Sequence, residues 1–289
     1  MFGRNNEDRV GPQMPPSDPP PIIPQEENQE SNSFEFSFST PTQFVELPSK
    51  GRFYLEGHPL YGKDSVEIRF MTAKDEDILT SKTLLKKGVA IDRLISNILI
   101  DKSLHPDLLL IGDKNAIIVA ARISGYVEKY QTSINCPSCG SSVSHTFDLS
   151  EQKIVHGDNF DGFEIEETEE KTFIITMPLS KARVEVRLMS GLDEKQLIKT
   201  SKSKQRHNLP ESPLTDVFKV YIKSVNGNKD TNMINSFVDH LPAIDSRYLR
   251  HAYKMVVPTV DLTQDFACRE CGYEQEMEVP FTSDFFWPK

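Results

Sequence analysis

Residues 66–79 read VEIRFMTAKDEDIL, and residues 184–197 read VEVRLMSGLDEKQL. Seven of these fourteen positions are identical, so we interpret the chain as a diverged duplication. In each copy the first six residues alternate between apolar and polar, which predicts a strand. Thr72 and Ser190 follow as predicted helix N-caps, because an aspartate stands three residues after each of them.

Paired carboxylates follow each predicted cap: Asp75 with Glu76, and Asp193 with Glu194. The dipole of a helix favours negative charge in its first turn. We therefore interpret these four residues as capping residues and not as catalytic acid–base pairs.

The segments that surround the repeat complete two similar halves. Helical spacing of apolar residues predicts helices over 73–88 (ended by Gly88), 91–99 and 113–124, and then over 193–201, 213–225 and 245–256. Each half closes with two strands around a turn, at 131–135 with 144–149 and at 262–267 with 274–279. The sequence predicts an α+β fold with a first half at 43–150, an acidic linker at 151–170 and a second half at 171–289.

The two turns between these closing strands carry all four cysteines of the chain, in the sequences CPSCG at 136–140 and CRECG at 268–272. A Cys-x-x-Cys-Gly turn points two sulfurs at one metal ion, and its glycine permits a left-handed backbone. Two such turns supply a complete tetrahedral site. We therefore predict one structural zinc ion, bound in a zinc-ribbon-like site by Cys136, Cys139, Cys268 and Cys271.

Two alternatives to this shared zinc site stay open, namely turns without metal and zinc or disulfide chemistry between chains. His145 lies close enough in sequence to replace a ligand, but we expect it to be an ordinary strand residue. A closed Cys₄ site leaves no coordination position for water, so the predicted zinc is structural and not catalytic.

Composition excludes several classes of protein. No apolar run reaches the roughly 18 residues that a membrane-spanning helix needs, and the first residues do not resemble a signal peptide. We expect a protein of a reducing cytoplasm, without a membrane partner. The net charge is −10, and no basic stripe indicates a nucleic-acid partner. A short basic cluster at 199–206 is interpreted as the solvated end of a helix.

The two ends of the chain differ in character. Residues 1–42 include seven prolines between Pro12 and Pro24, and this composition predicts a disordered tail. The opposite end carries Phe285, Phe286 and Trp287. These aromatic residues have two interpretations: they fold back on the core, or they form a hook that binds a partner protein.

The sequence contains no P-loop, no dinucleotide-binding glycine motif, no His-Glu-x-x-His and no Gly-x-Ser-x-Gly. The seven histidines show no metal-binding spacing. We therefore expect no enzymatic activity.

A set of motifs in a fixed order carries a resemblance to a known family. They are LPSKG at 47–51, Met71-Thr72 before Asp75-Glu76, Asp113 ahead of an alanine-rich helix, the two cysteine turns, and FFWP at 285–288. In this order they resemble the baseplate hub assembly proteins of T4-like contractile-tailed bacteriophages, over residues 44 to 289. The resemblance implies a late, non-enzymatic viral protein, which works with other hub and tail proteins in the host cytoplasm. It would be either a chaperone or a component of the virion baseplate.

Two other functions remain as alternatives. Zinc ribbons often bind nucleic acid, so a transcription-type accessory protein is the first. Against it, the second cysteine turn is surrounded by the carboxylates Glu270, Glu274, Glu276 and Glu278. The second is a hydrolase with an unrecognised site, which would show a cleft with converging carboxylates or histidines. The oligomeric state is not specified by the sequence.

Overall fold

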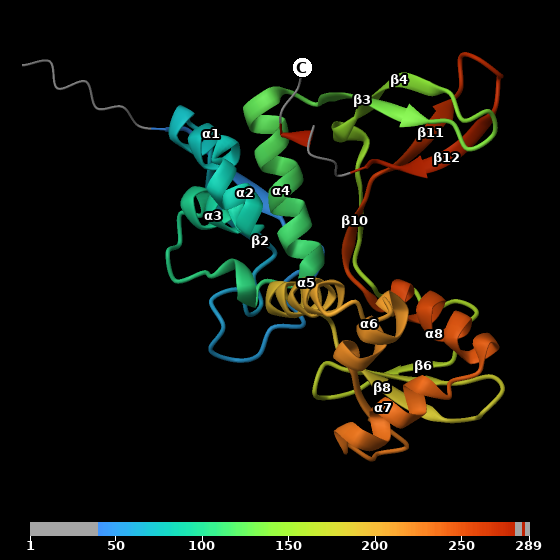
Figure 1. The fold of residues 1–289 in the computed structure, drawn as a ribbon. Helices are drawn as coiled ribbons and strands as arrows, with labels where there is room; N and C mark the ends of the chain where they lie inside the picture. The colour runs from blue at the N-terminus through green and yellow to red at the C-terminus, as the bar shows by residue number, and fades with distance from the viewer. Residues whose placement is uncertain (1–39, 281–284, 287–289) are drawn as a thin grey trace, which may run out of the picture. The chain divides into compact units, whose positions relative to one another are not determined.

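The computed structural model describes residues 40–280 and 285–286. Over these residues the chain is a mixed α/β protein with eight α-helices and five small antiparallel sheets (Figure 1). None of the helices described is both long and apolar enough to span a membrane. The predicted tail, residues 1–42, lies outside the described residues except for its last three.

The elements of the first part of the chain run from residue 42 to residue 155. They are β1 (Thr42–Glu46), β2 (Ser65–Arg69), α1 (Ala73–Thr80), α2 (Lys82–Lys87), α3 (Ala90–Ile98), a 3₁₀ turn (Pro106–Leu108), α4 (Ile111–Tyr126), β3 (Lys129–Asn135), β4 (Ser142–Asp148), a second 3₁₀ turn (Leu149–Glu151) and β5 (Lys153–Val155). Strands β1 and β2 pair with each other, as do β3 and β4.

The later elements include the largest sheet. They are β6 (Ile165–Glu167), β7 (Phe173–Thr176), β8 (Arg183–Val186), α5 (Gly191–Arg206), α6 (Pro213–Tyr221), β9 (Ile222–Val225), α7 (Thr231–Asp239), α8 (Ala243–Val256), β10 (Thr259–Asp261), β11 (Thr263–Ala267) and β12 (Glu274–Glu278). Strands β6 to β9 form one four-stranded sheet in chain order, β10 pairs with β5, and β11 pairs with β12.

Buried apolar residues form two clusters. The first cluster gathers β1 to β4, α3 and α4, together with β10 to β12 and the end of the chain. The second gathers β7 to β9 and helices α6 to α8. The last strands therefore pack with the first part of the chain, although we assigned them to a second half at 171–289. The predicted domain boundaries stay a prediction.

The repeated sequence has the same local structure at both places. Arg69 Nη1 and Nη2 donate to the two carboxylate oxygens of Asp75 at 2.6 and 3.0 Å, and Arg187 binds Asp193 in the same way at 2.8 and 2.7 Å. Each aspartate also accepts a hydrogen bond from the backbone N–H of the helix N-cap, Thr72 or Ser190. The predicted caps are confirmed, and their carboxylates are occupied by structural contacts.

A second pair of aspartates also repeats. Asp113 in α4 accepts hydrogen bonds from the backbone and hydroxyl of Ser49, at 3.0 and 2.6 Å. Asp245 in α8 accepts them from the backbones of Leu179 and Ser180, both at 2.9 Å. Around these contacts the sheets differ, since one is two-stranded and the other four-stranded. The duplication of whole halves stays a prediction, with these local matches in its favour.

Two predicted elements were wrong in detail. The helix predicted to end at Gly88 is two helices, because Ser81 caps a new one. The helix predicted over 213–225 stops at Tyr221, and the β-branched residues that follow pair with β8 as strand β9. The segment 151–170 contains β5 and β6, and its assignment as a linker stays a prediction. At 222–225 tertiary pairing outweighs local periodicity.

Candidate metal centre

Two hairpins from distant parts of the sequence present the cysteines. Hairpin β3–β4 places Cys136 and Cys139 in its turn, and hairpin β11–β12 does the same for Cys268 and Cys271. The two hairpins lie side by side (Figure 1). All four predicted ligands are therefore brought to one place.

The four sulfur atoms lie within 4.8 Å of one another. Across the two turns, Cys136 Sγ is 3.7 Å from Cys271 Sγ, and Cys139 Sγ is 3.9 Å from Cys268 Sγ. Sulfurs that are each about 2.3 Å from a tetrahedral zinc ion are separated by slightly less than 4 Å. The donor set is also the one that zinc prefers, so the residues fit this ion.

Each turn is closed by its own backbone. Gly140 N–H donates to Cys136 O at 2.9 Å, and Gly272 N–H donates to Cys268 O at 2.9 Å. Both glycines have a left-handed backbone, with φ of +72° and +71°, which other residues adopt at a cost. Within each turn the first cysteine is buried and the second is exposed.

Contacts behind the sulfurs hold one hairpin against the other. The side chain of Gln264 in β11 accepts a hydrogen bond from Asp148 N–H at 3.0 Å and donates to Asp148 O at 2.6 Å. The ring of His145 packs edge-on against Phe266, with centroids 5.4 Å apart. Sequence reasoning missed the Gln264 contact, because a glutamine in a short strand has no distinguishing pattern.

The surroundings of Cys139 and Cys271 shift the pKa values of their thiols in opposite directions. Hydrogen bonds from the side chain and backbone of Ser141 lower the pKa of Cys139 to about 6. At Cys271 the hydrogen bond from the backbone of Tyr273 lowers the pKa, but desolvation and the other three thiols raise it to about 12. One thiolate in the cluster thus forms readily and then opposes ionisation of its neighbours, a repulsion that a divalent cation would relieve.

His145 is a residue of strand β4, as expected, and lies outside the group of four ligands. Burial, and then the charge of Arg269, lower the pKa of His145. Hairpin β11–β12 carries four exposed carboxylates, Glu270, Glu274, Glu276 and Glu278. The surface around the second turn is therefore acidic.

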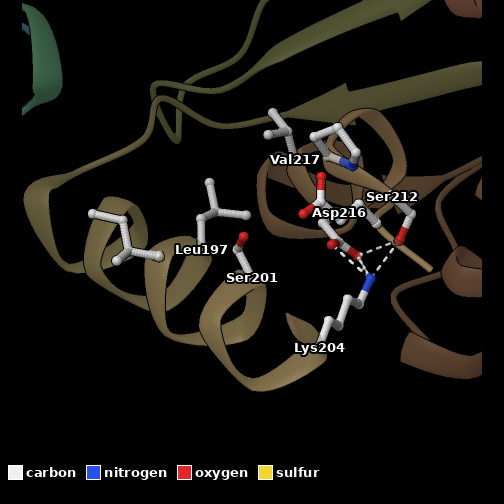
Figure 2. A pocket seen from close by; sticks show the side chains of 9 residues that line it. Leu197, Ser201, Lys204, Ser212, Asp216 and Val217 are labelled. Carbon is white, nitrogen blue, oxygen red and sulfur yellow. Dashed lines mark hydrogen bonds and ion pairs between the residues drawn. The ribbon is translucent and has the colours of Figure 1, made fainter. Parts of the chain in front are cut away.

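A separate pocket of about 230 Å³ lies between α5 and α6. Figure 2 shows that its two labelled charged residues face each other: Lys204 Nζ donates to both carboxylate oxygens of Asp216 at 2.7 Å. No histidine lines this pocket. Ser212 Oγ also contacts Lys204 Nζ and lies 3.4 Å from Asp216 Oδ1, so these three side chains are bound to one another.

The aromatic end of the chain is only partly within the described residues. Phe285 and Phe286 are 2% and 3% exposed and belong to the first apolar cluster. Arg122 Nε donates to Phe285 O at 2.5 Å, and the ring of Phe285 packs against Tyr130 at 5.2 Å. These two side chains fold back on the core, the first of the two interpretations, because burying them removes a large apolar area from water. A partner-binding role for this end of the chain stays a prediction. Trp287 lies outside the described residues.

Comparison with known proteins tests whether the chain belongs to a known family. No curated protein and no solved structure matches the chain. A family model described as T4 bacteriophage base plate protein matches residues 40–287, which include both hairpins and the repeated segments. This match confirms the resemblance noted from the order of the motifs. The chain therefore belongs to the T4 bacteriophage base plate protein family.

Proposed function

We propose that the four cysteines bind one zinc ion, which fastens hairpin β3–β4 to hairpin β11–β12. The observation that carries this proposal is the convergence of four sulfurs within 4.8 Å from two distant turns. Four thiolates fill a tetrahedral site, so the ion would stabilise the fold without activating water. The binding free energy of such an ion adds directly to folding free energy.

We also propose that the protein has a non-enzymatic role in the tail baseplate. Membership of the family supports a baseplate-related protein that contacts other tail proteins. Within that role we propose an assembly factor or component of the baseplate hub, acting in the host cytoplasm during assembly. A rigid, zinc-braced body is suited to presenting a binding surface, and the filled metal site has no place for a substrate.

Metal analysis of the purified protein tests the zinc site. We expect one zinc per chain in the wild type, and loss of zinc together with a lower melting temperature in Cys268→Ser. His145→Ala is the matched control, because this residue is beside the cluster but outside it, and it should keep its zinc. Reduced wild-type protein that binds no zinc when the ion is supplied would refute the proposal.

Infection experiments test the baseplate role separately. A phage that carries Cys268→Ser should produce fewer complete baseplates, whereas one that carries His145→Ala should assemble normally. Mass spectrometry of purified wild-type particles then distinguishes a retained hub component from an assembly factor that leaves. Normal baseplate yield after deletion of the whole protein would remove the proposed role without affecting the zinc proposal.

The nucleic-acid alternative has its own test. The exposed glutamates beside Cys268 and Cys271 would repel phosphates, so we expect no shift of DNA or RNA in low-salt gels. A shift that weakens as salt rises would restore the alternative.

A further inference from the structure

The chain has a net charge of −10, yet one groove of about 550 Å³ between α2 and α5 has no acidic residue in its lining. Six of the residues that line it are basic: Lys86, Lys87, Lys195, Lys199, Lys202 and Arg206. The sequence placed part of this set at the end of one helix. The fold adds the lysines of α2, more than a hundred residues earlier, to the same groove.

Most of these cations have no acidic partner in the part of the chain that the structure describes. Lys195 pairs with Asp92 at 3.1 Å and also with Asp107. The other five form no ion pair there, and all five are exposed. Elsewhere the same protein pairs exposed lysines with carboxylates, as Lys129 does with Asp148. Five exposed cations without an acidic partner among the described residues thus line one groove.

The geometry of the two helices explains why the charges meet. Gly88 ends α2 with a left-handed φ of +73°, and a Cβ atom at Gly88 would be 3.7 Å from Lys202 Nζ. The helix dipole accounts for basic residues in a last turn, such as Lys86, Lys87 and Arg206. It gives no reason for Lys199 and Lys202, which stand before the last turn of α5.

Apolar surface lies among the charges. Ile198 is in the groove and is 45% exposed, and Val89 is half-buried beside it. An exposed isoleucine framed by lysines is an anchor point for an apolar side chain, with the lysines placed to bind carboxylates around it. We propose that this groove binds an acidic polypeptide segment of a partner protein that carries an apolar side chain among its carboxylates.

A long nucleic acid fits the surface less well. Charges act over about 8 Å at physiological ionic strength, so a polyanion that extends past the groove would meet the acidic remainder of the protein. A short acidic segment places its charge in the groove only. The proposed surface is separate from the metal site, because the residues that line it belong to α2, α5 and the two residues that follow α2, and not to either cysteine hairpin.

Fluorescence anisotropy with a defined probe tests this inference. The probe is a fluorescein-labelled twelve-residue peptide that alternates Glu-Glu-Leu with Asp-Glu-Phe, and its counterpart has every acidic residue replaced by Gln or Asn. The full-length, zinc-loaded protein should bind the acidic peptide and not the neutral one. Lys199→Glu/Lys202→Glu should weaken binding about tenfold or more, since two attractions become repulsions.

The control variant is Lys74→Glu/Lys229→Glu, which changes the net charge equally at exposed lysines outside the groove. It should bind the acidic peptide like the wild type, and circular dichroism should show that both variants are folded. Equal weakening in the two variants would show an effect of net charge only and overturn the proposal. So would tighter binding of a twenty-nucleotide single-stranded DNA to the same groove, or no peptide binding at 50 mM salt.

Discussion

At the scale of single residues, the Asp75 carboxylate of the first repeat accepts hydrogen bonds from three different residues. Its oxygens accept hydrogen bonds from the guanidinium of Arg69, from Thr72 and from Asn97 Nδ2, and the side chain is fully buried. Burial by itself would raise the pKa of Asp75, but the hydrogen bonds from Arg69, Thr72 and Asn97 lower it to about 2. The carboxylate therefore contributes to stability only when ionised.

This pKa gives a prediction for the acid range. Because the folded pKa is below the unfolded value, the contribution of Asp75 is complete above about pH 5 and is lost as the pH falls toward 2. Asp75→Asn should reduce the free energy of unfolding at pH 7 by about 2 kcal/mol and flatten its dependence on pH in this window. Urea unfolding at several pH values measures both effects.

The control for this prediction lies in the same helix. Asp77 is exposed and its side chain has no hydrogen bond within the described residues, so Asp77→Asn should leave the free energy of unfolding within about 0.5 kcal/mol of the wild type. Equal pH profiles for Asp75→Asn and the wild type would contradict the assigned role.

A second prediction at this scale concerns the ligands individually. Each of Cys136→Ser, Cys139→Ser, Cys268→Ser and Cys271→Ser should weaken zinc binding, because zinc strongly prefers thiolate over a neutral hydroxyl. Competition with a chromophoric chelator measures the affinity. If only the variants of one turn lost zinc, the shared site would have to be replaced by a site between chains.

At the scale of elements, helix α4 depends on a glycine in its first turn. A Cβ atom at Gly112 would lie 1.8 Å from the carbonyl oxygen of Pro258, which precedes β10. Gly112→Ala should therefore force the two backbones apart and cost about 3 kcal/mol. For Gly125→Ala in the same helix, the nearest atoms to the new Cβ all belong to the flexible Met71 side chain, and the variant should remain within about 1 kcal/mol of the wild type. Thermal unfolding of both variants makes the comparison.

The end of the chain is also tested at the scale of elements. Phe285 is buried against Tyr130 and bound through its carbonyl by Arg122. Phe285→Ala should reduce the free energy of unfolding by about 3–5 kcal/mol. Phe44→Ala, where the side chain is 74% exposed, should be close to neutral. A Phe285→Ala protein of normal stability that had lost partner binding would instead support the interpretation that the aromatic end binds a partner protein.

At the scale of the whole molecule, Lys114 joins three helices. Its Nζ lies 2.9 Å from Asp92 in α3 and 2.6 Å from Glu194 in α5, and its side chain is 7% exposed. Burial lowers the pKa of Lys114, but Glu194 and Asp92 outweigh it and raise the pKa. The charge is thus retained where it links the first part of the chain to the second repeat.

Removal of this link is expected to be costly. Lys114→Ala leaves Glu194 without its ion-pair partner, although Asp92 keeps Lys195. It should reduce the free energy of unfolding by about 2 kcal/mol, because Lys114 itself is buried. Lys219→Ala removes an exposed pair with Asp239 and should cost about 0.5 kcal/mol. If both variants lost the same free energy of unfolding, and salt reduced both losses, the Lys114 ion pairs would be screened by solvent and would contribute no more than an exposed pair.

The features that the sequence determined are local ones. The features that follow from residue spacing are the capping aspartates Asp75 and Asp193, the strand–turn–strand form of the cysteine hairpins and the choice of the four cysteines as candidate ligands. Neighbouring residues set backbone hydrogen bonds and cap geometry. The order of a few such motifs was also enough to indicate the family.

Tertiary structure decided the features that depend on distant residues. It placed β10 to β12 with the first apolar cluster, turned residues 222–225 into a strand, buried Phe285 and Phe286, and brought the lysines of α2 and α5 to one groove. Each of these outcomes depends on which surfaces exclude water together and which backbone groups pair across the sheet. Periodicity along a single segment holds no information about either, so only the folded chain could settle them.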